Sequence, residues 1–402
     1  MSSLLGIAIR IAQRMGIHSE TTNCTYGNLE AEIRRRLWWS LILFDARIGE
    51  MVDYKTASLL PTWDCKTPLN VNDSELRPEM KVPPLSQNRP TEALFAVVRS
   101  EMGEFIRHSS FHLEFTNPAL KPVDKIKQHG SSSEKSQIAE IEQLIQEKYL
   151  RFCDEEDPLH FVTIWTVRGH LARCRLVEFY SQCSKLAAHP TEAQRDGALS
   201  YALTMIECDT KIMSSQLTGG YLWVADFNFP ALAYIQIVQD LRRRPTSEQS
   251  TRAWEVMNEN YETRFASPQK DDSLFIQLFS KMVLEAWEAQ EAAFMQSDKP
   301  LPPPRMVSCI KHTLASGRNI PHDAAAVVQN GAHPIHEGTE DAAVSMSIDG
   351  HILSNGLGGY FDYTASLPGP NLNMPAQPPL DINMNQLNWH HFGWGLGRPP
   401  GW

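Results

Sequence analysis

The sequence lacks the cysteine spacing of a zinc-binding module. Its seven cysteines are scattered, and no two of them lie within the gap of about two to four residues that is typical of zinc knuckles. They are Cys24, Cys65, Cys153, Cys174, Cys183, Cys208 and Cys309. We therefore expect no zinc cluster, no metal ligands and no cofactor in this chain. An odd cysteine count without a secretory signal favours reduced thiols, most of them filling helical cores.

The sequence also lacks an excess of positive charge and a long apolar run. Its 402 residues carry a formal net charge of -10, so the chain as a whole is not expected to bind nucleic acid non-specifically. Any contact with DNA would have to be local. The longest apolar run, around Leu37 to Phe44, is too short to span a bilayer and is interrupted by Ser40. A soluble, intracellular protein without a membrane partner is expected.

Catalytic constellations are missing as well. Asp271-Asp272 is the best candidate for the magnesium motif of a class I terpenoid synthase, which needs carboxylates one helical turn apart. Phe275 stands where the third carboxylate should be, and Asn72-Asp73 lies in a proline-bounded loop. An enzyme of this class remains only a remote alternative. We predict no catalytic residues and a protein that is not an enzyme.

Three further patterns resemble ligand sites but are interpreted otherwise. His333, His336 and Glu337 have a metal-ligand spacing without a helix to hold them. GLGGYF at Gly356 has neither a preceding strand nor a following helix, so it is not a phosphate loop. In the acidic run Cys153–His160, Asp157 before Pro158 is typical of a helix N-cap followed by proline at the first helical position.

The stretch Asn28–Asp45, NLEAEIRRRLWWSLILFD, is the strongest helical signal in the chain. Asn28 is a suitable N-cap, and Glu30/Arg34 and Glu32/Arg36 are ion pairs four residues apart. The apolar positions Ile33, Leu37, Leu41, Phe44 and Ile48 follow helical spacing, and Trp38, Trp39, Ile42 and Leu43 widen this stripe. A mostly buried core helix is predicted. A nucleic-acid-binding helix with interleaved aromatics is the less favoured alternative, because the arginines already have carboxylate partners.

A first helix precedes this stretch and a loop follows it. Ser3 can cap the first helix, and Gly16 followed by Ile17 is typical of a Schellman ending. Its expected inward stripe consists of Leu4, Ala8, Ile11, Ala12 and Met15. Pro61–Leu76 is expected to be an ordered loop, anchored by Trp63, Leu69, Val71 and Leu76, with Asp64 and Asp73 in turns and local caps.

The rest of the folded part is predicted to be helical, so the fold class is all-α. Helices are expected at Thr91–His108, Ile138–Tyr149, from Pro158 through Phe179, from Pro190 through Met213, at Phe227–Val238, after the capping-box pattern Thr246–Gln249, and at Leu274–Met295. Gly219-Gly220 should form a turn. In Leu241–Pro245, three arginines suit a helix C-terminus, and a nuclear-import signal is the less favoured interpretation.

Residues 300–402 differ in composition from the rest. After Pro300 they hold twelve of the 26 prolines and twelve of the 22 glycines, and we predict a disordered C-terminal tail that cannot bury enough apolar surface to fold. Near its end, the spaced residues Leu387, Trp389, Phe392 and Trp394 can either fold on a partner as a short amphipathic element or stay solvated.

Three motifs carry a family resemblance that covers roughly residues 1 to 295. They are the helix ending MGIH, the run RRRLWWSL at Arg34–Leu41, and the blocks PTWDC and PLNVND. Together they resemble the regulatory, or middle homology, region of fungal zinc-cluster transcription factors, also called the xylanolytic-activator regulatory domain. The glycine-arginine-proline triplet common after this helix in the family is missing, which indicates a divergent branch.

This resemblance implies a multi-helical array that follows a DNA-binding zinc cluster, and no residues here correspond to that cluster. Residues 1–299 are therefore expected to be an N-terminally truncated regulatory domain in a nuclear transcriptional regulator, by analogy one of a secondary-metabolism gene cluster. Expected partners are other transcription factor subunits or coregulators, with DNA reached only through a missing head or a partner. A stand-alone module that pairs with a full-length relative or binds a small-molecule effector is the alternative.

Overall fold

A computed structural model describes residues 2–51, 62–109, 111, 134–185, 190–265, 273–295 and 302–316. All regular structure in these ranges is helical, as predicted. The helices are α1 (Ser2–Arg14), α2 (Glu20–Asn23), α3 (Asn28–Met51), α4 (Leu94–His108), α7 (Glu134–Lys148), α8 (Pro158–Lys185), α9 (Glu192–Ser214), α10 (Leu222–Phe227), α11 (Ala231–Arg243), α12 (Ser250–Phe265), α13 (Ser273–Phe294) and α14 (Arg305–Ala315). Short 3-10 turns are η1 (Asp73–Glu75), η3 (Leu150–Phe152) and η4 (Gln216–Tyr221). Among the described helices, none combines the length and the apolar character that a membrane span requires.

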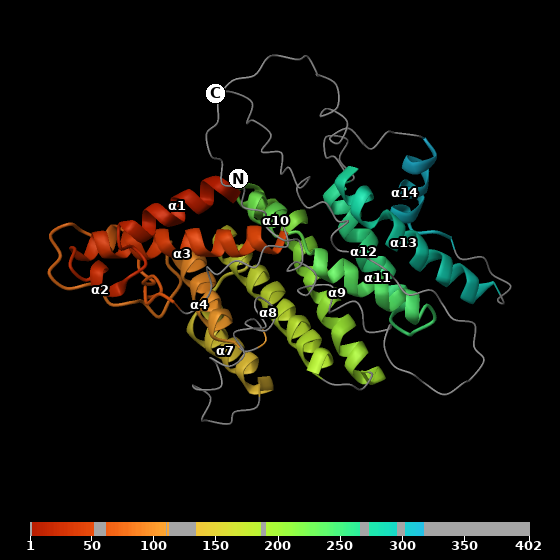
Figure 1. Cartoon of the computed structure of the whole chain (residues 1–402), viewed down its shortest axis with the longest axis horizontal. Coiled ribbons are helices and arrows are strands. Elements are labelled where there is room, and N and C mark those ends of the chain that lie inside the picture. The colour runs from red at the N-terminus through yellow and green to blue at the C-terminus, as the bar shows by residue number, and fades with distance from the viewer. Residues whose placement is uncertain are drawn as a thin grey trace, which may run out of the picture.

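The helices form an elongated array with α1, α2 and α3 at one end and α12, α13 and α14 at the other (Figure 1). Two large apolar clusters make up the core, one around α3, α4, α7 and the loop after α3, the other around α9 and α11 to α14. The 28-residue helix α8 borders both. Leu171 and Cys174 belong to the first cluster, whereas Ala172 and Leu176 belong to the second. Helix α8 therefore packs against both apolar clusters and connects them.

Local capping signals explain several helix ends. The Asp157 carboxylate accepts a hydrogen bond from the His160 backbone N–H at 3.0 Å, so the N-cap predicted before Pro158 is confirmed. At the end of α1, Gly16 has a φ of 72°, and the Ile17 N–H bonds to the Ala12 carbonyl at 3.0 Å. This is the Schellman ending predicted from the glycine, because only glycine adopts a positive φ without strain.

The inward face of α1 is not the predicted one. Leu4, Ile11 and Met15 were expected to face the core, but they are largely exposed, while Leu5 and Ala12 are buried. Leu4 and Leu5 are both apolar, so spacing alone did not choose between two neighbouring faces of this helix. The packing of α1 against α3 determines that Leu5, and not Leu4, is buried.

Three boundaries in the second half also differ from the prediction. The helix expected over Phe227–Val238 is divided: α10 ends at Phe227, and α11 begins after Pro230, which cannot donate a helical hydrogen bond. Helix α9 is capped by Thr191, which forms a capping box with Gln194, and not opened by Pro190. The capping box expected at Thr246 is not formed, because α12 begins only at Ser250.

Regular structure continues beyond residue 300. Helix α14 lies inside the region predicted to be a tail, and its Met306, Val307 and Ile310 are completely buried against α12 and α13. The prediction was wrong for this segment because the proline and glycine content was averaged over about a hundred residues. Residues 317–402, including the aromatic residues near the end, lie outside the described part of the chain, and the division into a domain and a tail stays a prediction for them.

Candidate functional site

The candidate site is the first half of α3 with the loop that follows it, where the resembling motifs fall. Helix α3 begins at Asn28, and the Gly27 carbonyl accepts the first helical bond from the Ala31 N–H at 2.9 Å. The predicted N-cap role of Asn28 is therefore wrong by one residue. Its side-chain amide donates instead to the Met80 carbonyl at 2.9 Å.

Arg34 is engaged on three sides. Its Nε donates to Glu30 at 2.8 Å, as the spacing of four residues predicted. Its Nη1 donates to the Met15 carbonyl at 3.1 Å, and its guanidinium lies 3.7 Å from the centre of the Tyr26 ring. The side chain thereby ties α3 to the end of α1.

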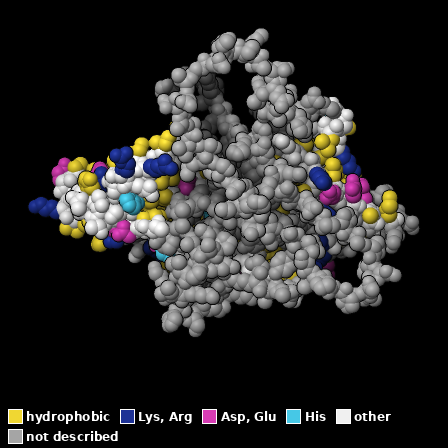
Figure 2. Space-filling model, viewed as in Figure 1, with side chains coloured by type: hydrophobic (Ala, Val, Ile, Leu, Met, Phe, Trp, Pro, Cys, Tyr) yellow, Lys and Arg dark blue, Asp and Glu magenta, His cyan; other side chains and the backbone are white. Residues whose placement is uncertain are grey.

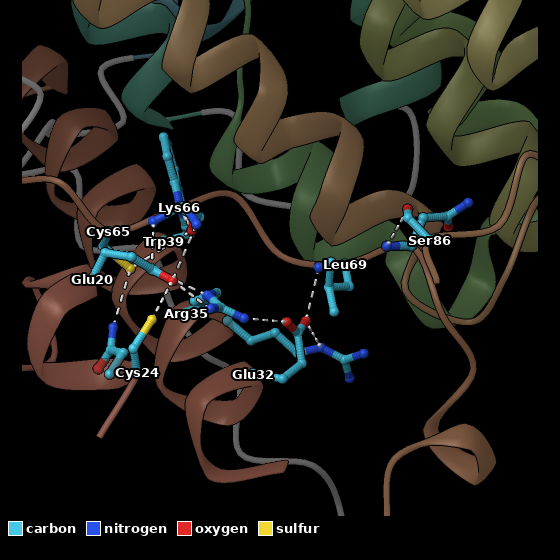
Figure 3. A network of polar contacts seen from close by, with 12 residues as sticks. Glu20, Cys24, Glu32, Arg35, Trp39, Cys65, Lys66, Leu69 and Ser86 are labelled. Carbon is cyan, nitrogen blue, oxygen red and sulfur yellow. Dashed lines mark hydrogen bonds and ion pairs between the residues drawn. The ribbon is translucent and has the colours of Figure 1, made fainter. Parts of the chain in front are cut away.

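Arg35 lies between two acidic side chains, as Figure 3 shows. It donates through Nε to Glu20 at 3.2 Å and through Nη2 to the other oxygen of the same carboxylate. Its Nη1 is also 3.6 Å from Glu32. The Glu20 carboxylate in turn accepts from the Lys66 backbone N–H at 3.1 Å. This arginine therefore joins α2, α3 and the following loop.

Arg36 completes the network. It donates to Glu32 at 3.0 Å, the second predicted pair, and to Asp73 at 2.6 Å. Glu32 is completely buried and also accepts from the Leu69 backbone N–H at 3.0 Å. Asp73 lies in the turn η1, in agreement with its expected place in a turn or local cap, and its carboxylate also bonds to Arg36 across 37 positions of sequence. All three arginines of the triplet Arg34–Arg36 are therefore paired with carboxylates of the same chain, and these pairs help to hold α3 against α2 and the following loop.

The two central carboxylates have opposite pKa shifts. Burial acts to raise the pKa of Glu20, but the hydrogen bonds from Arg35 and Lys66 together with the Arg35 charge lower it below its ordinary 4.5. For Glu32 burial prevails, and its pKa is raised despite the Leu69 N–H and Arg36. Glu20 is thus the carboxylate whose ionised form the network stabilises most clearly.

Aromatic packing lies behind these charges. The Trp63 ring from the loop meets Trp38 and Trp39 edge to face, with centroids 5.5 Å and 5.2 Å apart. Trp39 donates its indole N–H to the Lys66 carbonyl at 2.9 Å. Arg107 of α4 covers the Trp63 ring at 3.6 Å and donates to the Trp63 carbonyl at 2.7 Å. Residues 62–76 therefore form an ordered loop, and the predicted anchors Trp63 and Val71 are confirmed as buried.

Two predicted apolar contacts of α3 are not made. Ile33 and Leu37 are about half exposed, while Trp38, Trp39 and Ile42 are almost completely buried. The buried stripe is therefore rotated toward the tryptophans, because the loop carrying Trp63 packs on that side. The expectation that little of this helix faces water was too strong.

Some partners in the site gave no recognisable sequence signal. Glu20, 15 positions before Arg35, was not predicted to contact it, and no contact was predicted for Arg107. Asp64, expected in a local turn, accepts from the Glu20 N–H at 2.9 Å. Asn70 is completely buried and donates to the carbonyls of Gln87 and Arg89. These are contacts between segments, which spacing rules cannot show.

A second buried polar cluster, also missed, holds the other half together. Arg264 of α12 donates to Asp209 of α9 at 2.7 Å and to the Ala225 carbonyl of α10 at 3.0 Å. Asn260 donates to the same carboxylate at 2.7 Å and accepts from Tyr234 at 2.8 Å. Four helices therefore meet at one ion pair.

Two arginines of the triplet Arg242–Arg244 are also engaged in the fold, whereas Arg243 is exposed. Arg242 pairs with Glu285 at 2.9 Å, and Arg244 contacts Asp240 at 2.7 Å and Asp196 at 2.6 Å. Paired side chains of this kind are poorly available to an import receptor, which supports the structural interpretation of Leu241–Pro245.

Most of the sequence patterns that resembled ligand sites lie outside the part of the chain that the structure describes. Within the described ranges no group of three or more His, Cys, Asp or Glu side chains is placed to hold a metal ion. Asp271-Asp272, His333, His336, Glu337 and Gly356 fall outside those ranges. The prediction that the chain holds no catalytic, cofactor-binding or metal-ligating residues stays a prediction.

The helical array, and the loop that packs on the RRRLWW run of α3, agree with the protein family that the sequence motifs resemble. Residues 1–144 match the family described as the fungal specific transcription factor domain, and this part of the chain belongs to that family. The resemblance to the regulatory region of fungal transcription factors is thereby confirmed. No solved structure matches the chain.

Individual relatives are fungal transcription regulators. The chain is 47% identical over 399 residues to the transcriptional regulator AacuB of Aspergillus aculeatus, covering 98% of this chain and 54% of the relative. It is 42% identical over 415 residues to the transcriptional regulator nsrM of Aspergillus novofumigatus, covering 100% and 55%. The aurofusarin cluster transcription factor aurR2 of Gibberella zeae is 30% identical over 332 residues, covering 77% and 45%. The chain thus spans about half the length of these relatives.

Proposed function

We propose that this chain regulates transcription of a fungal secondary-metabolism gene cluster in the nucleus, through protein contacts of its helical domain. The observation that carries this proposal is the engagement of Arg34, Arg35 and Arg36 in ion pairs with carboxylates of the same chain. Side chains so engaged are not free to neutralise DNA phosphates. Relatives that are transcriptional regulators by name support the regulatory role.

On this proposal, DNA is reached through another part of the regulator or through a partner subunit, such as a zinc-cluster protein. Coregulators or other transcription factor subunits are the expected partners, and no catalytic step is involved. Binding of a small-molecule effector has less support than binding of a protein partner. The groove lined by Leu144, Lys148, Arg151 and Phe152 is open to solvent at the surface of α7 and η3, and does not lie within the helical core.

A tethering experiment tests the proposal. The full chain is fused to a heterologous DNA-binding domain in a filamentous fungus that carries a reporter with the matching operator. We expect reporter transcripts to rise or fall several-fold relative to the DNA-binding domain alone. An Arg252→Ala fusion serves as the control, because Arg252 forms only an exposed pair with Glu207 and should leave the effect unchanged.

Two outcomes would count against the proposal. If the fusion reaches the nucleus at equal abundance and reporter transcripts do not change, the chain has no regulatory activity of its own. If an effect arises only when a full-length relative is expressed with it, the chain is the stand-alone module that pairs with that relative.

A further inference from the structure

Helix α1 presents an apolar ridge to solvent. Leu4, Ile7, Ile11 and Met15 are 72%, 52%, 53% and 51% exposed. Their spacing of three and four positions places them within about 80° of one another around the helix. Single exposed apolar residues are normal, but four in one line on a helix mark a contact surface. Figure 2 shows yellow and dark blue side chains together at the end of the molecule where α1 lies.

Positive charge flanks this ridge on one side. Arg10 and Arg14 are exposed, and by helical geometry they lie next to Ile7. Helix α1 contains no acidic residue, and in the described part of the chain no carboxylate lies within ion-pair distance of either arginine. We call Leu4, Ile7, Arg10, Ile11, Arg14 and Met15 the α1 face. Its arginines differ from Arg34 to Arg36, which are all paired.

The chain itself contains a segment of complementary chemistry. Residues 319–397 carry seven Asp and Glu residues and no Lys or Arg. Within them, Leu380, Met384 and Leu387 follow the spacing of one helix face, preceded by Pro379 and accompanied by Asp381. An apolar ridge with a carboxylate beside it is what an apolar ridge flanked by arginines binds best.

Two other occupants fit less well. A second copy that docked α1 on α1 would bring four arginines together without a carboxylate, and like charges at an interface oppose association. A nucleic acid would use the two arginines but leave the apolar ridge without a partner. The chemistry of the α1 face therefore favours an acidic, apolar peptide.

We infer that Leu380–Trp389 docks on the α1 face of its own chain. The covalent connection allows this, because the roughly 60 residues after Ser316 can span up to about 200 Å. A tethered peptide also competes at an effective concentration of up to millimolar order. Given the proposed function, docking would hide the aromatic end of the chain from coregulators, so that the contact is autoinhibitory. The contact itself does not depend on that function.

Photo-crosslinking in the full chain tests this contact. A benzophenone amino acid replaces Ile7, and the cross-linked peptides are identified by mass spectrometry. We expect the main product to join residue 7 to the peptide that contains Leu380–Trp389 within one chain of monomer mass. A main product between two chains, or one that joins residue 7 elsewhere, would overturn the inference whether or not the reporter responds to the tethered chain.

Paired variants separate the roles of the ridge and the charges. Met384→Glu with Leu387→Glu should lower the yield of this cross-link at least about fivefold, whereas Leu372→Glu, outside the segment, should leave it unchanged. Arg10→Glu with Arg14→Glu should also lower it. Unchanged yields in both double variants, with α-helical circular dichroism preserved, would contradict docking by this segment.

Discussion

Replacing Arg35 by alanine should destabilise the fold strongly, because two acidic side chains depend on it. The side chains of Arg35, Glu20 and Glu32 are 13%, 10% and 0% exposed. Removing one partner of a buried pair leaves an uncompensated charge, which costs about 3–5 kcal/mol. Some of this cost is relieved for Glu20 by the Lys66 N–H, which remains in place. We therefore expect Arg35→Ala to lower the free energy of unfolding by about 3 kcal/mol.

The assay is urea unfolding of the full chain, followed by tryptophan fluorescence and by far-ultraviolet circular dichroism. Arg252→Ala is the matched control, since its pair with Glu207 is 63% and 39% exposed. An exposed pair contributes about 0–1 kcal/mol, so this variant should unfold almost like the unaltered chain.

A double variant tests whether the cost comes from the unpaired carboxylate. Adding Glu20→Gln to Arg35→Ala removes that charge, and the double variant should recover about 1–2 kcal/mol relative to the sum of the single costs. If Arg35→Ala costs less than about 1 kcal/mol, or if the two single costs simply add, the network does not hold α2, α3 and the loop together as described.

Three further predictions concern pH, thiol reactivity and packing. Because the pKa of Glu20 is lower in the folded chain, its contribution to stability is present above its ordinary pKa of 4.5 and is lost as pH falls below it. Glu20→Gln should therefore weaken the acid dependence of urea unfolding between about pH 5 and 3, and an unaltered profile would contradict this. Burial raises the pKa of the Cys65 thiol to about 12, so iodoacetamide at pH 8 should label exposed Cys24 at least about 100-fold faster, as peptide mapping can show. A Cβ on Gly103 would come within 2.9 Å of α3 side chains, so Gly103→Ala should cost about 1–3 kcal/mol, whereas Gly197→Ala in open space should be neutral or stabilising in thermal unfolding.

Local rules predicted the parts of the site that lie within one helix. The pairs of Glu30 with Arg34 and of Glu32 with Arg36 follow from a spacing of four residues, and both are observed. The pair of Glu20 with Arg35 does not, because a turn and the start of a helix separate the two residues. Contacts of this kind are set by how α2 and the loop pack on α3, which a single sequence does not show.

Boundaries and faces were predicted less well where two signals competed. In α1, apolar residues occur on more than one side, and the position of α3 decided which of Leu4 and Leu5 is buried. In α14, the local pattern of Met306, Val307 and Ile310 was a helical signal, but the composition of the following residues outweighed it. Averages over long segments conceal short helices that pack on an existing core.

The most direct test of the central claim is a DNA-binding measurement on the purified full chain at low salt. Its arginines Arg34 to Arg36 are engaged within the fold, and its regulatory role is proposed to run through protein contacts. In fluorescence anisotropy with labelled promoter fragments, we expect no binding beyond weak non-specific association, with dissociation constants above about 10 μM at 100 mM salt. Sequence-specific binding at nanomolar concentration that Arg34→Gln with Arg36→Gln abolishes, while circular dichroism shows the fold intact, would contradict the claim.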